Sequence, residues 1–489
     1  MPELWYQGGG DSKISGVNTK SQPELFRLLP SVDELLQRDE IKPLVENEGR
    51  AATVDAARQV LAQLRQEIAA GRLVSDNAVQ LGIAGLTSAI ARQLRTATAF
   101  SLKEIVNASG VILHTNLGRA PLSQSAIDHI GQIAGRYGNL EFDIAAGTRG
   151  RRDIHVEGLF SRLLNRDGVS GTRTVVVNNC AAAVMLALNT LAEGGEVVVS
   201  RGELVEIGGS FRVPDVMNKS GATLREVGTT NRTRLDDYAR AINDKTRLLL
   251  RVHRSNFAII GFTEQPSLEE LCDLGRKHNI PVMEDLGGGA LLPLRSLGVN
   301  ESGVADSLRA GVDLVTYSGD KMLGGPQAGM LTGREDLIRR VRSNPLFRAL
   351  RVDKLIYAAL EGTLMEYVRE NHTAVPFVRM LSMPAEEIRK RAEAFREKIS
   401  PAAHLKGNII PGESLVGGGS APTSTLPTFL LAITSESLSA DQLAEKLRLS
   451  TPPIVARVEE GRVLLDLRTV FEDEEDLIVD ALCTIDARL

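Results

Sequence analysis

The segment TYSGDKMLGGPQAG, from Thr316 to Gly329, decides the fold of this chain. It follows an apolar run, VDLV, that predicts a buried strand, and it combines one lysine, Lys321, with four glycines. The lysine comes before the glycine pair, which excludes a Walker-type phosphate loop. A lysine whose pKa is lowered in a buried site can instead form a Schiff base with a carbonyl cofactor. We expect the glycines to leave room for cofactor and substrate; the competing interpretation is a surface lysine in a turn.

A second candidate, Asp285, closes the predicted strand IPVMED. A buried carboxylate is costly without a cationic partner, and the pyridinium nitrogen of pyridoxal phosphate (PLP) is such a partner. An aspartate keeps that nitrogen protonated, so that the ring acts as an electron sink. Glu284 is the competing choice, although alternation along a strand points the two side chains to opposite faces. The alternative is an aspartate that caps a helix before LGGGA.

A third feature is the segment NNCAAAV, residues 178–184, where a predicted strand gives way to a helix that begins with small residues. The first N–H groups of a helix form an anion site, and small side chains let a phosphate approach. Close helix–sheet packing is the alternative. Ser318 offers the phosphate a hydroxyl, and Asn256 offers a donor to a phenolate oxygen. The predicted cofactor-binding residues are Lys321, Asp285, Cys180, Ala181, Ala182, Asn256 and Ser318.

Around these residues the sequence alternates strand-like and helix-length segments, which predicts a mainly parallel sheet covered by helices on both faces. Ligands in such sheets bind at the carboxyl ends of the strands. The chain order is a helix start that binds an anion, then Asp285, then Lys321 after 36 residues. This order is typical of fold-type I PLP-dependent enzymes, and we predict that α/β fold.

Four regions are predicted along the chain. Residues 1–22 form a disordered polar tail, and residues 23–104 form an N-terminal helical module. Residues 105–385 form the large PLP-binding domain, and residues 386–489 form a small α+β domain. The helical pattern of the module is carried by apolar residues at spacings of three and four, which place them on one helical face: Val54, Ala57, Leu61, Leu64 and Ile68.

The bulk composition restricts the class of protein. The chain has 489 residues and a net charge of −5, so no global positive field indicates a nucleic-acid partner. Its three cysteines are far apart, which indicates a reducing compartment and neither a disulfide framework nor a metal site. Neither a signal peptide nor an apolar run of about 18 residues is present, so we expect a cytoplasmic protein with no membrane partner.

Five longer segments carry a family resemblance. NLGRAPLS (116–123), VGTTNRTRLDDY (227–238), EDLGGGAL (284–291), YSGDKMLGGPQAG (317–329) and NPLFRALRVDK (344–354) closely resemble the bacterial L-seryl-tRNA(Sec) selenium transferases, or selenocysteine synthases. The resemblance runs from about residue 25 to the C-terminus. It implies a PLP-dependent transferase that converts seryl-tRNA(Sec) to selenocysteyl-tRNA(Sec) with selenophosphate. It also implies a homo-oligomer, a decamer built as a pentamer of dimers, whose helical module contacts the tRNA.

The chemistry that this family implies suits the candidate residues. Lys321 releases the cofactor to the seryl amine and then removes the Cα proton. Water is lost by β-elimination, and selenium adds to the resulting aminoacrylyl intermediate. Selenophosphate is an anion, so the site needs arginines.

The arginines that match family positions are Arg119, Arg348 and Arg351, which we count with Lys321 as catalytic. Arg348 and Arg351 share a face if they are helical, and a solvated helix face is the alternative. The basic run TRGRR, residues 148–152, could serve tRNA phosphate or substrate, or be an exposed loop.

The helical module is a difficult tRNA-binding surface, because residues 1–90 hold nine Lys/Arg against twelve Asp/Glu, a net charge of −3. Phosphate contacts normally need local positive charge. We therefore expect recognition by shape, through a few arginines on one face: Arg27, Arg50, Arg58 and Arg65. The alternative is a module that only mediates contacts between subunits.

Two other functions compete with the transferase. One is a PLP-dependent lyase or aldolase acting on a small amino acid or amino sugar, for which the helical module would have no purpose. The other is a non-catalytic RNA-binding scaffold on the same fold, against which Lys321 and Asp285 argue.

Overall fold

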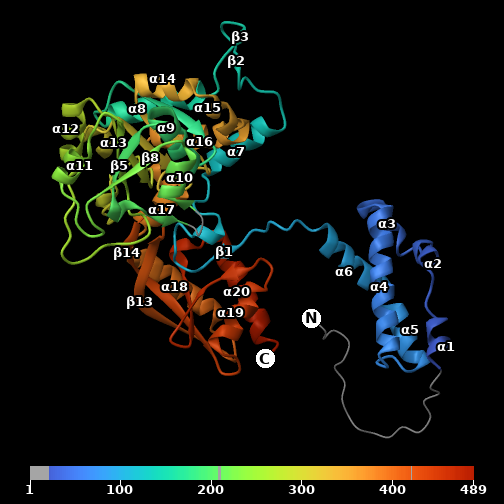
Figure 1. Ribbon diagram of the computed structural model, residues 1–489. Coiled ribbons are helices and arrows are strands. Elements are labelled where there is room, and N and C mark those ends of the chain that lie inside the picture. The colour runs from blue at the N-terminus through green and yellow to red at the C-terminus, as the bar shows by residue number, and fades with distance from the viewer. Residues whose placement is uncertain (1–20, 208–210, 420) are drawn as a thin grey trace. The chain divides into compact units, whose positions relative to one another are not determined.

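The computed structural model describes residues 21–207, 211–419 and 421–489. The tail predicted over residues 1–22 therefore lies almost entirely outside the described residues. The chain divides into two compact units, residues 1–103 and residues 104–489, and each is described by itself (Figure 1). Within the described ranges, no helix combines the length and the apolar character that crossing a membrane requires.

The first unit is helical, and its longest helix is α4. On α4 the side chains of Ala57, Leu61, Leu64 and Ile68 are buried and Val54 is half-buried, so the predicted apolar face is confirmed. These residues pack mainly against α6 and the short helices. The helices are α1 (Gln22–Phe26), α2 (Val32–Leu36), α3 (Lys42–Glu48), α4 (Arg50–Ala69), α5 (Asp76–Ala84) and α6 (Leu86–Thr98).

The second unit is built on a seven-stranded sheet with the strand order β4-β12-β11-β10-β9-β5-β8. Only β12 runs antiparallel to its neighbours in this sheet, so the predicted mainly parallel sheet is confirmed. The strands are β4 (Thr172–Val177), β5 (Glu196–Ser200), β8 (Thr223–Val227), β9 (Thr246–Val252), β10 (Val282–Gly287), β11 (Leu314–Ser318) and β12 (Gly329–Arg334).

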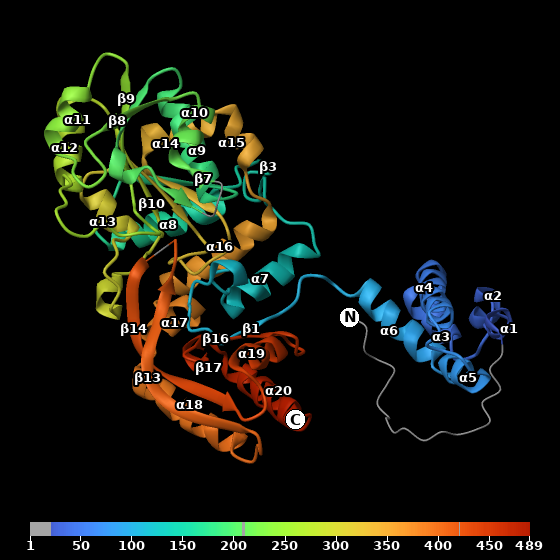
Figure 2. The same cartoon turned by 60° about the horizontal axis from the view of Figure 1, so that its bottom comes forward.

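Helices cover both faces of this sheet, as Figure 1 and Figure 2 show. One face packs against α9 (Cys180–Ala192), α10 (Val213–Lys219) and α14 (Glu335–Ser343). The other face packs against α8, α11, α12, α13 and α16. Their bounds are α8 (Ile154–Arg166), α11 (Leu235–Ala241), α12 (Leu268–His278), α13 (Val304–Arg309) and α16 (Lys354–Val368). A mainly parallel sheet buried between two helical layers is the architecture of fold-type I PLP enzymes.

The strand that carries Asp285 is longer than predicted. β10 continues to Gly287, so Asp285 lies inside the strand and does not close it. The ladder to β11 pairs Asp285 with Thr316 and then shifts by one residue before Gly287. Such an irregularity bends a strand and re-aims its side chains.

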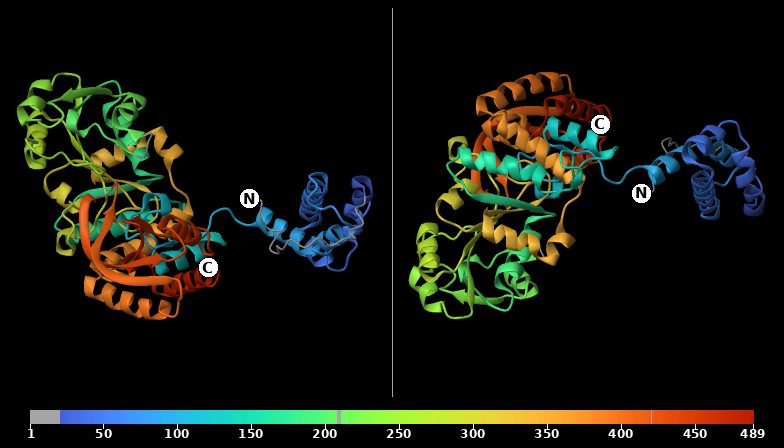
Figure 3. Two further views of the ribbon diagram at one scale, coloured as in Figure 1. Left: turned by 90° about the horizontal axis from the view of Figure 1, so that it is seen from below. Right: turned by 90° about the horizontal axis from the view of Figure 1, so that it is seen from above.

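The C-terminal part adds a four-stranded antiparallel sheet with the order β13-β14-β17-β16. Its strands are β13 (Leu405–Gly417), β14 (Ala421–Ser435), β16 (Arg457–Glu459) and β17 (Arg462–Asp466), and α18 (Ala385–Ile399) lies along it (Figure 3). The long β13–β14 hairpin extends from this sheet toward the larger one (Figure 2). The remaining elements are α19 (Ala440–Arg448), α20 (Glu475–Asp486) and β15 (Ile454–Val455), which pairs with β1 (Val106–Asn107). The domain boundary predicted between residues 385 and 386 stays a prediction.

Candidate active site

Lys321 lies in the turn that follows β11, where three backbone segments meet. Its Nζ donates a hydrogen bond of 2.5 Å to the carbonyl oxygen of Gly419, at the tip of the β13–β14 hairpin. A Cβ placed on Gly287 would lie 3.7 Å from Nζ, and one on Gly419 would lie 3.8 Å from it. The amine is therefore surrounded by bare backbone from β10 and from a hairpin 98 residues further along the chain.

The glycines of the opening segment do not serve the purpose predicted for them. A Cβ on Gly319 would come within 2.4 Å of the Pro326 carbonyl, and one on Gly324 would meet the Val375 side chain at 2.4 Å. These glycines allow close packing of the protein on itself, so the expectation that they leave room for ligands is wrong. Gly287 and Gly419 are the glycines that border the lysine amine.

Asp285 is buried and lies close enough to Lys321 to interact with its charge. Its Oδ1 accepts hydrogen bonds from Thr316 Oγ1 at 3.1 Å and from Cys180 Sγ at 3.5 Å. Burial raises the pKa of the Asp285 carboxyl, and the charge of Lys321 and these hydrogen bonds act in the opposite direction. Burial raises the pKa of the Glu284 carboxyl as well, while Ser307, Arg251 and His253 lower it.

Only some of the N–H groups at the start of α9 could bind an anion. The Asn179 side chain caps the helix by accepting from the N–H of Ala182 at 2.8 Å, so this predicted phosphate donor is already engaged. The N–H groups of Cys180 and Ala181 precede it in the first turn. The side chain of Cys180 turns to Asp285, which links the helix start to the carboxylate.

Ser318, Arg119 and Asp320 form a polar cluster directly beside Lys321. Ser318 Oγ donates to Oδ1 of Asp320 at 2.6 Å, and Arg119 pairs with Oδ2 at 3.0 Å. Arg119 has a left-handed backbone, with φ of 64°, which turns its side chain toward Asp320 at the cost of some strain. Asp320 is a site residue that was not predicted from the sequence, although a carboxylate directly before the lysine is a signal for it.

Asn256 lies on the exposed loop that follows β9. Its amide donates to the carbonyl oxygen of Glu206 at 2.7 Å. No hydrogen bond among the described residues joins Asn256 to Lys321 or Asp285. Its predicted contact with the cofactor stays a prediction.

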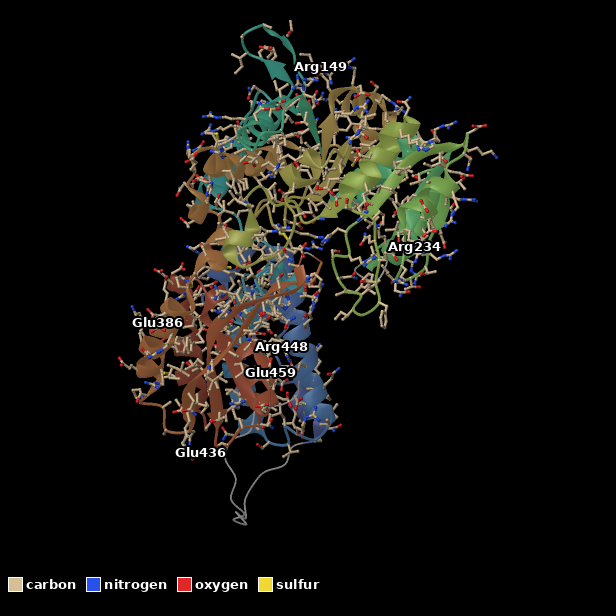
Figure 4. All side chains as sticks on the ribbon, turned by 90° about the vertical axis from the view of Figure 1, so that its left-hand side faces the viewer. Arg149, Arg234, Glu386, Glu436, Arg448 and Glu459 are labelled. Atoms are coloured by element: carbon tan, nitrogen blue, oxygen red, sulfur yellow. The ribbon has the colours of Figure 1, made fainter. Side chains whose placement is uncertain are left out.

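Arg348 and Arg351 line a pocket of about 390 Å³. The pocket is also lined by the basic run, whose hairpin carries Arg149 in Figure 4. Glu141 forms ion pairs with Arg149, Arg152 and Arg351. The arginines around the pocket are Arg149, Arg151, Arg152, Arg342, Arg348 and Arg351. The backbone of Arg351 pairs with Val177, which ties this pocket to the strand that leads into α9.

The residues around Lys321 suit PLP. Among the described residues, no Lys, Arg or His side chain forms an ion pair with Asp285, although its carboxylate is buried and costly to ionise there. A cationic ring nitrogen would supply the missing partner. An amine bordered by bare backbone and a helix N-terminus with small side chains would suit the carbonyl group and the phosphate.

Comparison with known proteins identifies relatives over nearly the whole chain. A family model described as L-seryl-tRNA selenium transferase matches residues 105–471, and one described as selenocysteine synthase N terminal matches residues 26–65. The L-seryl-tRNA(Sec) selenium transferase of Geotalea uraniireducens (strain Rf4) is 45% identical over 466 residues, which is 94% of this chain and 99% of the relative. That of Geobacter metallireducens (strain ATCC 53774 / DSM 7210 / GS-15) is 46% identical over 467 residues, with the same two coverages.

A solved structure of D-glucosaminate-6-phosphate ammonia-lyase resembles the second unit in fold. It has a TM-score of 0.56 and 22% sequence identity, and it covers 79% of this chain and 96% of its own. At this identity the likeness shows a shared architecture and carries nothing about the substrate.

Proposed function

Because the chain belongs to the L-seryl-tRNA selenium transferase family, we propose that it converts L-seryl-tRNA(Sec) to L-selenocysteyl-tRNA(Sec) with PLP as cofactor and selenophosphate as selenium donor. Family membership supplies the substrate and the cofactor. The observation that carries the assignment within this chain is the pair formed by Lys321 and buried Asp285, which lie beside bare backbone and a helix N-terminus. When bound, PLP supplies an electron sink for charge that develops at the seryl Cα.

The residues of this chain take separate roles in that reaction. Lys321 Nζ would hold the cofactor carbonyl and, once displaced by the seryl amine, would take the proton from Cα. Asp285 would keep a proton on the ring nitrogen. The helix start at Cys180 and Ala181 would bind the phosphate, and Asn256 would donate to the phenolate oxygen. Ser318 would join them once its hydroxyl turns from Asp320 to the phosphate.

The arginines would hold the anionic selenium donor. Arg348 has no carboxylate partner among the described residues, whereas Arg351 shares Glu141 with two other arginines. A guanidinium free to bind is what a phosphate-like anion requires. Arg119 forms an ion pair with Asp320, the residue before Lys321. Arg119 would therefore bind the anion close to the lysine amine.

The larger assembly is also part of the proposal. The N-terminal helical module would bind the tRNA, and the chain would form a decamer of five dimers, as the family resemblance implies. Large apolar side chains are exposed in the second unit, which supports the proposal that other copies of the chain cover them in an oligomer. They are Tyr137, Phe142, Ile144, Ile260 and Phe262. The reaction would take place in the cytoplasm, where aminoacylated tRNA is made.

Borohydride reduction followed by peptide mapping tests the proposal. We expect the pyridoxyl group on Lys321, and we expect Lys321→Ala to lose the visible absorbance of the bound cofactor and all turnover while it still binds seryl-tRNA(Sec). Lys406→Ala is the control, because Lys406 is an exposed lysine paired with Glu436, far along the chain in β13. A label on another lysine, or turnover by Lys321→Ala, would contradict the assignment. If wild-type protein carries PLP and fails to bind seryl-tRNA(Sec) at low salt, the lyase alternative is favoured.

A further inference from the structure

Two donors from different elements reach the same oxygen of Asp285. Thr316 lies opposite Asp285 in the neighbouring strand, and its hydroxyl donates to Oδ1 at 3.1 Å. Cys180 is the first residue of α9, 105 positions away in sequence, and its Sγ lies 3.5 Å from Oδ1, a separation that suits the larger sulfur atom. No hydrogen bond from a described residue reaches Oδ2.

The thiol of Cys180 acts as a donor because of where it lies. Burial and the negative charge of Asp285 raise its pKa well above the usual range for cysteine, more than the charge of Lys321 lowers it. The sulfur therefore keeps its proton and is not a reactive thiolate. A protonated thiol beside a carboxylate oxygen can only donate to it.

We propose that Cys180 is a positioning residue for the cofactor: together with Thr316 it fixes Oδ1 of Asp285, which presents Oδ2 to the ring nitrogen of PLP. This inference rests on the proposed function, since the ring nitrogen belongs to the cofactor. Two donors on one oxygen also restrict rotation of the carboxylate, so that the free oxygen has one orientation.

The groups around Asp285 determine how its pKa changes when the Cys180 donor is removed. Burial raises the pKa of its carboxyl, while the charges of Lys321 and His253 and the hydrogen bonds from Thr316 and Cys180 lower it. Glu284, its neighbour in β10, is the like charge on the same strand. Removing the Cys180 donor should raise the pKa of Asp285 further. PLP binding needs the ionised carboxyl. As the pH is lowered, the variant should therefore begin to lose PLP at a higher pH than the wild type does.

The test measures the dissociation constant of PLP from the full-length protein between pH 6 and 8.5. We expect Cys180→Ala to weaken PLP binding about fivefold at pH 7, the factor that one net hydrogen bond represents. We also expect the pH at which binding is lost to move upward. Cys180→Ser keeps a hydroxyl donor and should recover part of the affinity. Thr316→Val removes the other donor with little change in volume and should shift the pH dependence in the same direction.

Cys272→Ala is the matched control, because Cys272 is buried in α12 and no hydrogen bond among the described residues joins it to Asp285. It should bind PLP as the wild type does at every pH. Wild-type affinity in Cys180→Ala, or a loss of affinity that is equal at all pH values, would overturn the inference. If the wild type itself fails to attach PLP at Lys321, the proposed function falls and this inference falls with it, so the two failures are distinguishable.

Discussion

Glu284 and Asp285 are neighbours in β10, but their carboxylates have different hydrogen-bond partners and therefore affect stability differently. Both carboxylates are buried, each with 7% of its surface exposed. Asp285 has two hydroxyl or thiol donors and the Lys321 charge, whereas Glu284 Oε2 lacks a hydrogen-bond partner among the described residues. Burial raises the pKa of Glu284, even though the Ser307 hydroxyl and the charges of Arg251 and His253 offset part of the effect.

We predict that Glu284→Gln raises the free energy of unfolding by about 1 kcal/mol at pH 8 and by less at pH 5. The folded protein holds a proton on Glu284 to a higher pH than the unfolded chain does. The wild type consequently loses stability as pH rises from the ordinary glutamate pKa of about 4.3 through the raised pKa of the folded state. The amide has no proton to lose. Urea unfolding at both pH values measures the difference.

The control for this prediction is Glu397→Gln, an exposed glutamate on α18. It should change stability little, and equally at the two pH values. An effect of Glu284→Gln that does not depend on pH would contradict the argument, because a packing change alone would not follow the titration of the carboxyl.

The first residue of strand β12 lies in close contact with the residue that caps helix α9. Gly329 is the first residue of β12, paired on one side with Val177 and on the other with Ser318. A Cβ on Gly329 would lie 2.0 Å from the carbonyl oxygen of Asn179, the residue that caps α9. The backbone of the strand thus touches the backbone of the cap, and only glycine permits that distance.

We predict that Gly329→Ala lowers the free energy of unfolding by about 1–3 kcal/mol, because the backbone of the cap must move. Gly131→Ala in α7 (Gln124–Ala134) is the matched control, since Gly131 is exposed and its added Cβ would meet nothing within 4 Å. The control should gain about 0.5–1 kcal/mol from helix propensity. Urea unfolding measures both variants, and a shift of the two in the same direction would sink the prediction.

For the whole molecule, the helical unit poses the problem of binding RNA with a negative net charge. Arg50, Arg58 and Arg65 all lie exposed on α4, at intervals of eight and seven residues. These intervals are about two turns each, so the three guanidinium groups share one face of the helix. Within the described part of this unit, Arg58 has one ion pair, a long and exposed one with Asp55 at 3.5 Å. The face is therefore available to phosphate, and Arg27 at the end of α1 is exposed as well.

We predict that the double variant Arg58→Glu, Arg65→Glu lowers the affinity for tRNA(Sec) about tenfold or more at 0.1 M salt. The slope of log affinity against log salt should fall by about 2, one for each phosphate contact removed. PLP incorporation should not change. Filter binding across a salt series measures both quantities.

The matched control is Arg448→Glu, an exposed arginine in the last turn of α19 (Figure 4). It introduces the same kind of charge reversal outside the helical unit and should leave the slope as it is. If the double variant and Arg448→Glu lost the same affinity for tRNA(Sec), the cause would be a general charge effect. That result would contradict a binding face on α4.

The sequence by itself determined the alternation of strands and helices, the mainly parallel sheet, the buried face of α4 and the placement of Lys321 near Asp285. Each follows from local periodicity or from the order of strand ends along the chain. Tertiary structure alone decided that Gly419 meets Lys321 across 98 residues and that Cys180 meets Asp285 across 105. It also joined Arg119 to Asp320, placed Arg348 and Arg351 around a pocket and made β12 antiparallel. Local pattern specifies which face of an element is buried, but contacts between distant segments depend on how those faces pack, and no short stretch of sequence contains that information.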